Sequence, residues 1–318
     1  MKIAVLCNHP LGLPAIDYLL ANNLLAGIAC PQIPNDNFFR LQFMAQDKNI
    51  PFGMIDEANL QKSLSEWIKK TKADIVFIFT FPYKIPKDCL KIPRLGFLNF
   101  HTGLLPSYRG GDPIFWQIFA QEKKGGVSVH KTTEDLDKGP LAYIEAVEIL
   151  GEDTYGQHIQ KIAIATKKAC TYIVENFPNL KFVDQDESLA NYQNRPNFYD
   201  LIIDWERFSA SQIKALIRAS NPTYGGAITF FRGVPVHILQ VSIGSAKDPM
   251  NVKAGTIISS GKDGIIVATS DNKLMRLDIV YTEDGFFTGG KLAVTFDIKE
   301  KELFTLPPLP PNPEEVAV

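Results

Sequence analysis

The chain has 318 residues, of which 45% are hydrophobic and 21% are charged, an ordinary composition for a globular protein of two domains. The formal net charge of −2 excludes a strong overall attraction to nucleic acid, although a local basic patch stays compatible with it.

Cysteine usage and the N-terminus indicate the compartment. Cys7, Cys30, Cys89 and Cys170 include no C-x-x-C pair, so we expect reduced and mostly buried thiols rather than a disulfide or a metal site. The apolar run at the start, MKIAVLC, is too short for a signal peptide, and no segment has the length of a membrane span. These features predict a cytoplasmic protein with no membrane partner and no metal.

Strand-like and helix-like patterns alternate along the first half. We predict strands and helices, in chain order, as follows: strand 2–7, helix 13–24, strand 24–30, helix 59–72, strand 74–80, strand 96–100, a helix near 113–121, strand 126–132 and helix 154–177. The continuous apolar run DIVFIFT at 74–80 is typical of a parallel strand that is covered on both faces. The order predicts a doubly wound, mostly parallel α/β domain over residues 1–183, with ligands at the carboxyl ends of its strands.

The second half has a different pattern. Residues 184–203 are polar and irregular and are predicted to be a linker. After a short helix at 209–218, several short strands are separated by glycine-containing turns, which predicts a small β-barrel over residues 204–304. The proline-rich residues 305–318 are predicted to form an extended tail.

The chemistry-bearing residues lie at the end of the strand predicted at Leu95–Phe100 and in the loops that follow it. Asn99 and His101 lie two residues apart and therefore point to the same side of a strand. A loop rich in glycine and proline follows, and Asp137 comes shortly before Gly139. An amide donor, an imidazole and a carboxylate are sufficient for acyl transfer to an amine, because they stabilise an oxyanion and move a proton. Taken singly, Asp137 has an alternative interpretation as a turn carboxylate, and His101 as a structural histidine at a strand end.

The ordered combination is more specific than its parts. It consists of FLNFHTGLLPSYRGGDP (97–113), GVSVH (126–130) and TTEDLDKGP (132–140). This combination resembles the folate-dependent formyltransferases. The stretches 204–233 and 254–269 resemble the C-terminal domain of methionyl-tRNA formyltransferases, a layout shared with two-domain amino-sugar formyltransferases. The resemblance implies a Rossmann-like catalytic domain, an OB-like C-terminal barrel and 10-formyltetrahydrofolate as co-substrate.

The resemblance also implies roles for individual residues. Asn99, His101 and Asp137 match the family's catalytic trio: the first two would stabilise the oxyanion of a tetrahedral intermediate, and Asp137 would orient His101 and assist proton removal. Folate contacts are expected at Phe81, Pro82, Tyr83, Lys84, Ile85, Leu104, Leu105, Pro106, Glu134 and Leu136. Acceptor contacts are expected at His9, Arg40, Tyr108, Arg109 and Gly110. An ordinary strand–helix turn at 81–85 and a surface arginine at 109 are the alternatives. Thr102-Gly103 replaces the family's usual Pro-Ser or Ala-Ser, and structural roles are predicted for His130, His158 and His237.

The acceptor is ambiguous. The two-domain layout favours charged initiator tRNA, but residues 31–51, where tRNA enzymes carry a basic insertion, contain only Arg40 and Lys48 as basic residues. Residues 200–303 hold twelve basic and twelve acidic residues, whereas a tRNA surface needs a local positive excess. An amino-sugar nucleotide or another small amine is therefore the alternative acceptor.

Two further functions could use a folate site. A formyltetrahydrofolate hydrolase would use water as the acceptor, but that family usually adds an N-terminal regulatory module, and here the catalytic pattern starts at Met1. A non-enzymatic folate-binding protein is disfavoured by the intact trio.

Overall fold

The computed structural model describes residues 1–245 and 251–307. Contacts divide the chain into two compact units. The first contains residues 1–114, 123–149 and 157–195, and the second contains residues 115–122, 150–156 and the chain from 196 onward.

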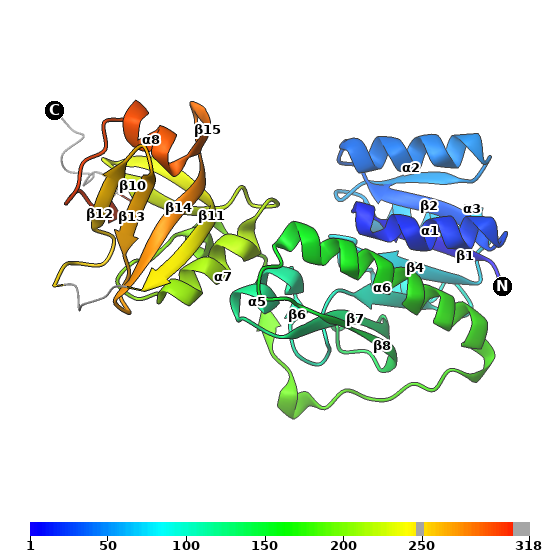
Figure 1. The fold of residues 1–318 in the computed structure, drawn as a ribbon. Helices are drawn as coiled ribbons and strands as arrows, with labels where there is room; N and C mark the ends of the chain where they lie inside the picture. The colour runs from blue at the N-terminus through cyan, green and yellow to red at the C-terminus, as the bar shows by residue number, and fades with distance from the viewer. Residues whose placement is uncertain (246–250, 308–318) are drawn as a thin grey trace, which may run out of the picture. The chain divides into compact units, whose positions relative to one another are not determined.

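The first unit is built on a mixed sheet of seven strands, in the order β3-β2-β1-β4-β5-β7-β8 (Figure 1). Five of these strands run parallel: β1 (Ile3–Cys7), β2 (Leu25–Pro31), β3 (Phe52–Ile55), β4 (Ile75–Phe79) and β5 (Phe97–His101). β7 (Lys124–Lys131) and β8 (Leu141–Glu148) extend the sheet antiparallel. The predicted, mostly parallel α/β domain is confirmed.

Helices cover both faces of this sheet, which explains why β1 and β4 are buried at every position. On one face, Ala4 and Leu6 of β1 pack in a cluster with Leu64 and Trp67 of α3 (Leu60–Thr71). α1 (Leu13–Ala21) and α6 (Tyr155–Asn176) lie on the opposite face (Figure 1). The unit also contains α2 (Asp36–Asp47), α4 (Lys87–Leu90) and the start of α5 (Pro113–Phe119).

The second unit is built on an antiparallel sheet. Its path is β12 (Ile257–Gly261), β13 (Gly264–Ala268), β14 (Lys273–Thr282), β11 (Val234–Ser245), β10 (Ala227–Phe231) and β16 (Phe304–Thr305), with β15 (Gly285–Thr288) beside β14. α7 (Ala210–Ser220) starts at a capping box formed by Ser209 and Gln212, and α8 (Gly289–Thr295) follows β15. The amide of Ile257 donates to the carbonyl of Glu302, just before β16 pairs with β10, so this segment links the two ends of the sheet.

The predicted strands and helices are confirmed within a few residues at each end. The apolar spacing in the sequence did not predict α2, β3 or β8. α2 mixes polar and apolar residues, and β3 and β8 are the edge strands of the sheet. Residues 184–195, predicted to be part of a linker, pack within the first unit and contain β9 (Tyr192–Gln193), which pairs with β6 (Arg109–Gly110). Short 3-10 turns occur at Pro10–Gly12, Phe177–Asn179, Glu187–Leu189 and Phe198–Leu201. The predicted tail lies outside the described residues from 308 onward.

Two expectations from composition can be compared with the structure. All four cysteines are buried free thiols, as predicted, and burial raises the pKa of Cys7 to about 12. Among the described residues, no helix combines the length and apolar character that crossing a membrane requires.

Candidate active site

The site lies in the first unit, where β5 and β7 run side by side. Asn99 and His101 both belong to β5, and the antiparallel register places His130 of β7 directly opposite Asn99. Directly opposed residues on neighbouring strands bring their side chains close together, and Asn99 Nδ2 lies 3.2 Å from His130 Nε2. The strand pairing therefore adds a second imidazole to the predicted trio.

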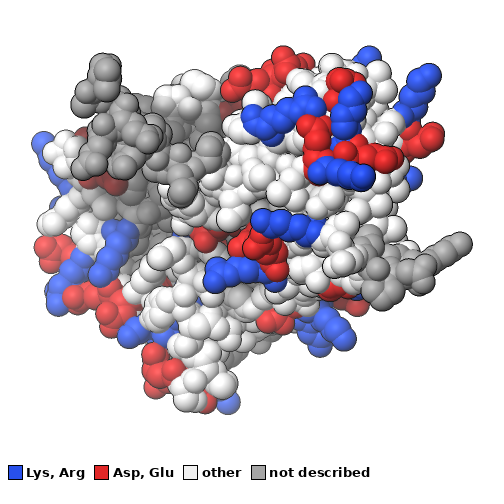
Figure 2. Space-filling model, turned by 90° about the vertical axis from the view of Figure 1, so that its left-hand side faces the viewer, with Lys and Arg blue, Asp and Glu red and all other residues white. Residues whose placement is uncertain are grey.

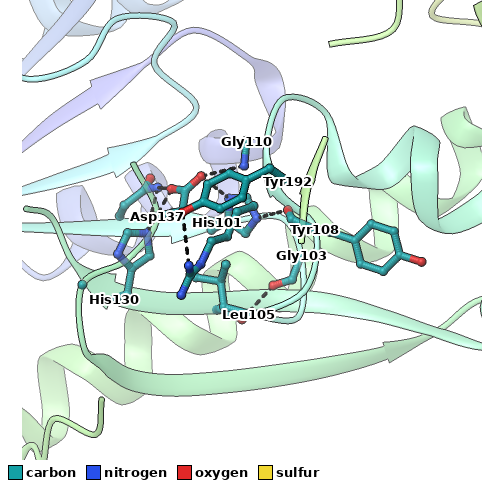
Figure 3. A network of polar contacts seen from close by, with 12 residues as sticks. His101, Gly103, Leu105, Tyr108, Gly110, His130, Asp137 and Tyr192 are labelled. Atoms are coloured by element: carbon teal, nitrogen blue, oxygen red, sulfur yellow. Dashed lines mark hydrogen bonds and ion pairs between the residues drawn. The ribbon is translucent and has the colours of Figure 1, made fainter. Parts of the chain in front are cut away.

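Asp137 reaches this point from the loop of residues 132–140, called here the carboxylate loop (Figure 3). Its Oδ1 accepts a hydrogen bond of 3.2 Å from Asn99 Nδ2 and lies 3.3 Å from His130 Nε2. Its Oδ2 accepts a hydrogen bond of 3.0 Å from the amide of Gly110 and lies 3.6 Å from His101 Nδ1. The structure thus brings together the three residues predicted to be catalytic, and it places Gly110 beside them.

The backbone of the carboxylate loop is unusual at Asp137. Its φ of 54° lies in the left-handed region, which a residue other than glycine adopts at a cost of about 1–3 kcal/mol. Two residues further, Gly139 passes so close to β7 that an added Cβ would lie 1.7 Å from the carbonyl oxygen of Lys131. The glycine is therefore required by a close backbone approach, which holds the loop against the strand.

The protonation states follow from the hydrogen-bond partners. His101 Nε2 lies 2.8 Å from the carbonyl of Tyr108, and His130 Nδ1 lies 3.0 Å from the carbonyl of Lys131. A carbonyl only accepts, so each of these ring nitrogens carries a hydrogen. The remaining nitrogen of each ring faces Asp137, and the carboxylate would stabilise a second proton on His101.

Burial and charge oppose each other in this group. His101 and Asp137 are 6% and 5% exposed. Burial lowers the pKa of His101 below its ordinary value, and the carboxylate of Asp137 offsets only part of that shift. Burial by itself would raise the pKa of Asp137, but the rings of His101 and His130 and the amide of Gly110 hold it well below its usual range. Asp137 is consequently an ionised carboxylate in a nearly water-free position, as a group that orients the neighbouring rings requires.

Residues 102–111, called here the glycine loop, pass over the end of β5. Ser128 of β7 anchors its start: the hydroxyl donates 2.7 Å to the carbonyl of Gly103 and accepts 3.0 Å from the amide of Leu105. An added Cβ at Gly103 would lie 3.0 Å from His101 Nε2, so the departure from the family's usual serine leaves space beside the imidazole. Leu105 is buried, whereas Leu104 and Pro106 are half-buried.

Arg109, predicted to contact a ligand, is fully buried and bonded within the protein. Its guanidinium donates to both carboxylate oxygens of Glu187, at 2.7 and 2.9 Å, and to Gln185 and Tyr192. Glu187 raises the pKa of Arg109 through these bonds, and the arginine in turn lowers the pKa of Glu187. Gln185, Glu187 and Tyr192 lie in a segment whose polarity alone gave no functional signal, because their partners are more than 70 positions away in sequence.

The predicted folate residues outside the glycine loop lie on two loops, and an ion pair bridges the carboxylate loop and the start of α4. Phe81 and Tyr83 follow β4 and pack edge to face at 5.3 Å, and Ile85 is part of the core. Glu134 of the carboxylate loop forms an ion pair of 2.6 Å with Lys87, immediately beyond this loop. Pro82 and Lys84 are exposed, as is Leu136 at 54%.

The other two predicted acceptor residues lie nearer the N-terminus. The Nδ1 of His9 accepts a hydrogen bond from the amide of Leu11, and burial lowers the pKa of His9. Arg40 is exposed on α2. Within the described part of the chain, no group of three or more His, Cys, Asp or Glu side chains has the arrangement of a metal site.

Comparison with known proteins identifies the family. Residues 1–174 match the formyl transferase family, and residues 199–285 match the formyl transferase C-terminal domain. The chain is 30% identical over 233 residues to the methionyl-tRNA formyltransferase of Pseudoalteromonas translucida (strain TAC 125), covering 73% of this chain and 72% of that protein. It is 28% identical to the methionyl-tRNA formyltransferase of Acidithiobacillus ferrooxidans (strain ATCC 53993 / BNL-5-31), with 72% of each chain covered.

Solved structures share the fold at lower identity. HypX from Aquifex aeolicus in complex with tetrahydrofolic acid superimposes with a TM-score of 0.64 at 15% identity, over 95% of this chain. This chain spans about half of that protein, 48% of its length. The N-formyltransferase from Helicobacter canadensis, in complex with folinic acid and dTDP-3-aminofucose, gives a TM-score of 0.64 at 16% identity, over 87% of this chain and 98% of that one. Because the formyl transferase match alone spans more than half of the sequence, the chain belongs to the folate-dependent formyltransferase family of enzymes.

Proposed function

We propose that this enzyme transfers the formyl group of 10-formyltetrahydrofolate to a primary amine, with Asn99, His101 and Asp137 as its catalytic residues. The observation that carries the proposal is the convergence of the three side chains: Asp137 lies 3.2 Å from Asn99 Nδ2 and 3.6 Å from His101 Nδ1. Family membership supports the reaction type.

The chemistry follows from these groups. The amine nitrogen attacks the formyl carbon, and the carbonyl π electrons move onto oxygen to give a tetrahedral oxyanion. Asn99 Nδ2 and a protonated His101 would stabilise that oxyanion in place of present partners, Asp137 Oδ1 for Asn99 and the carbonyl of Tyr108 for His101. Each such donor contributes about 3 kcal/mol. The amine gives up a proton with the help of Asp137, and the folate nitrogen gains one as its bond to the formyl carbon breaks.

Folate is proposed to bind between the loop at 81–85 and the carboxylate loop. The exposed ion pair between Lys87, at the start of α4, and Glu134 bridges the two sides of this proposed site. Leu104, Leu105 and Pro106 would border the same pocket from the glycine loop. The folates named with the Aquifex and Helicobacter proteins support a folate co-substrate.

Charged initiator tRNA is the first proposed acceptor, because the relatives that match over most of their length are methionyl-tRNA formyltransferases. In this proposal the C-terminal sheet is an OB-like barrel, as the link between the ends of the sheet suggests. His9, Arg40, Tyr108 and Gly110 remain proposed acceptor contacts. Arg109 would support the glycine loop rather than contact the acceptor, since its guanidinium is bonded to Glu187.

A nucleotide-linked amino sugar is the second candidate, and a specific observation favours it. Three basic residues that could form a tRNA surface already have partners in this chain. Lys214 pairs with Glu152, Arg232 pairs with Glu302, and Arg218 donates to two backbone carbonyls. On the face drawn in Figure 2, basic and acidic side chains are interspersed among the described residues. Such a surface offers few unpaired charges to phosphates.

The test is formyl transfer from 10-formyltetrahydrofolate, run in parallel on charged initiator tRNA and on a panel of amino-sugar nucleotides. Formylation of either acceptor supports the reaction and identifies the acceptor class. Rapid release of formate with no formylated amine would instead assign the chain as a formyltetrahydrofolate hydrolase. Folate binding without any turnover would assign it as a folate-binding protein.

A further inference from the structure

The side chain of Gln185 connects the carboxylate loop to the buried arginine. Its Nε2 donates to two backbone carbonyls, those of Asp137 at 2.7 Å and Gly139 at 2.8 Å. Its Oε1 accepts two hydrogen bonds from Arg109, at 2.8 and 3.2 Å. Every polar atom of the carboxamide is therefore used.

The orientation of this carboxamide is fixed by its neighbours. Carbonyl oxygens only accept and a guanidinium only donates, so a flipped amide would lose all four hydrogen bonds. Glu187 completes the arrangement by holding Arg109 with two charge-assisted bonds, at 2.7 and 2.9 Å. Arg109 is fully buried, and it therefore presents its donors to Gln185 in a single geometry.

The same stretch of chain also holds the glycine loop. The carbonyl of Asn191 accepts from the amide of Arg109 at 3.0 Å, and its Oδ1 accepts from the amide of Tyr108 at 2.7 Å. The carbonyl of Gln193 accepts from the amide of Gly111 at 2.8 Å. Residues 185–193, called here the return segment, are thus bonded to both loops that border the catalytic carboxylate.

We propose that Gln185, fixed by Arg109 and Glu187, is a positioning residue that holds the Asp137 carboxylate against His101, His130 and the Gly110 amide. The proposal rests on the proposed function, because it assigns Gln185 to the reaction through Asp137. The left-handed backbone of Asp137 needs such support, since a conformation of this kind persists only where surrounding contacts enforce it. Both hydrogen bonds of Gln185 Nε2 end on carbonyls of this strained turn.

The first test uses two substitutions of Gln185 and a matched control. Gln185→Ala removes all four bonds, and Gln185→Glu keeps an acceptor for Arg109 but removes the two donors to the carboxylate loop. Asp184→Ala is the control, because Asp184 is the exposed neighbour in the same stretch of chain. We expect both Gln185 variants to lose about tenfold to a hundredfold in kcat with a nearly unchanged KM for folate, since displacement of a catalytic group by about 1 Å costs rate in this range. Asp184→Ala should keep wild-type kcat.

The second test separates positioning from general destabilisation. In an Asp137→Ala background, Gln185→Ala should lower single-turnover transfer no further, because a residue that acts through Asp137 has nothing left to position. If the double variant instead lost rate by the product of the two single-variant factors, the proposal would be overturned. Wild-type kcat in Gln185→Glu would also overturn it.

A third readout does not depend on activity. The Gly110 amide donates to Asp137 Oδ2, so its hydrogen exchange reports the place of the carboxylate. We expect faster exchange at Gly110 in Gln185→Ala than in Asp184→Ala, with both proteins folded. If the wild type transferred no formyl group, the proposed function would fail while this measurement still tested the positioning of Asp137. Unchanged exchange at Gly110 would refute the positioning even in an active enzyme.

Discussion

His101 and His130 each turn one ring nitrogen toward a different oxygen of the same carboxylate. His101 Nδ1 lies 3.6 Å from Asp137 Oδ2, and His130 Nε2 lies 3.3 Å from Asp137 Oδ1. The other nitrogen of each ring is bonded to a backbone carbonyl. Asp137 therefore lies within reach of both rings, and its carboxylate opposes the effect of burial on the pKa of His101.

Replacing each proposed catalytic residue should stop turnover without unfolding the protein. Asn99→Ala, His101→Ala and Asp137→Ala are each expected to lower kcat by about a hundredfold or more, because each removes a group that stabilises or orients charge in the transition state. Steady-state kinetics together with thermal unfolding would check this. Near-normal turnover in the Asn99 and His101 variants would disprove the assignment.

Gly139→Ala should disturb the carboxylate loop. The new methyl group would be built 1.7 Å from the carbonyl oxygen of Lys131, so the backbone must move, at a cost of about 1–3 kcal/mol in stability. Gly151→Ala is the matched control, because a Cβ there meets nothing within 4 Å. We expect chemical denaturation to show a loss for Gly139→Ala alone, together with reduced kcat. Equal stability of the two variants would contradict the close approach.

The titration of His101 should depend on Asp137. Burial lowers the pKa of His101 and the carboxylate opposes that effect, so Asp137→Asn should lower the pKa further. If turnover requires a protonated His101, the alkaline loss of activity moves to lower pH in the same direction. NMR titration of the imidazole would measure the shift, with exposed Asp135→Asn as the control. A rise in the pKa of His101 in Asp137→Asn would be incompatible with the observed geometry.

Chelators should leave the formyl transfer rate unchanged. The proposed chemistry relies on an amide, an imidazole and a carboxylate, and the described residues hold no cluster of metal-ligand type. Activity would be measured before and after exhaustive treatment with a chelator. Loss of activity that a divalent ion restores would show this expectation to be wrong.

Salt dependence should report the acceptor. A tRNA held through six or more phosphates loses affinity about a thousandfold or more between roughly 50 and 200 mM salt, whereas a small amine with one or two phosphates loses little. We expect the modest dependence, because Lys214 and Arg232 are paired with acids. Binding of initiator tRNA would be measured over a salt series. A steep slope with efficient formylation of that tRNA would identify a methionyl-tRNA formyltransferase with an unusual acceptor region.

Most of the fold and the catalytic trio could be predicted from the sequence. The continuous apolar run within 74–80 marked a buried parallel strand, because a strand covered on both faces carries apolar residues at successive positions. The two-residue spacing of Asn99 and His101 fixed their common side, and the short motif around Asp137 and Gly139 identified the third member. These features are local in sequence, so they can be recognised without knowing which segments pack together.

Only the tertiary structure revealed the partners that the trio requires. His130 joined the site through strand register, which no local pattern specifies. Arg109 proved to be bonded to Glu187 and Gln185, although 76 or more positions separate them. The return segment was predicted to be part of a linker because its side chains are polar. Their function depends on hydrogen bonds to backbone groups that folding brings close. Such long-range pairings produce no periodic pattern of apolar residues in the sequence.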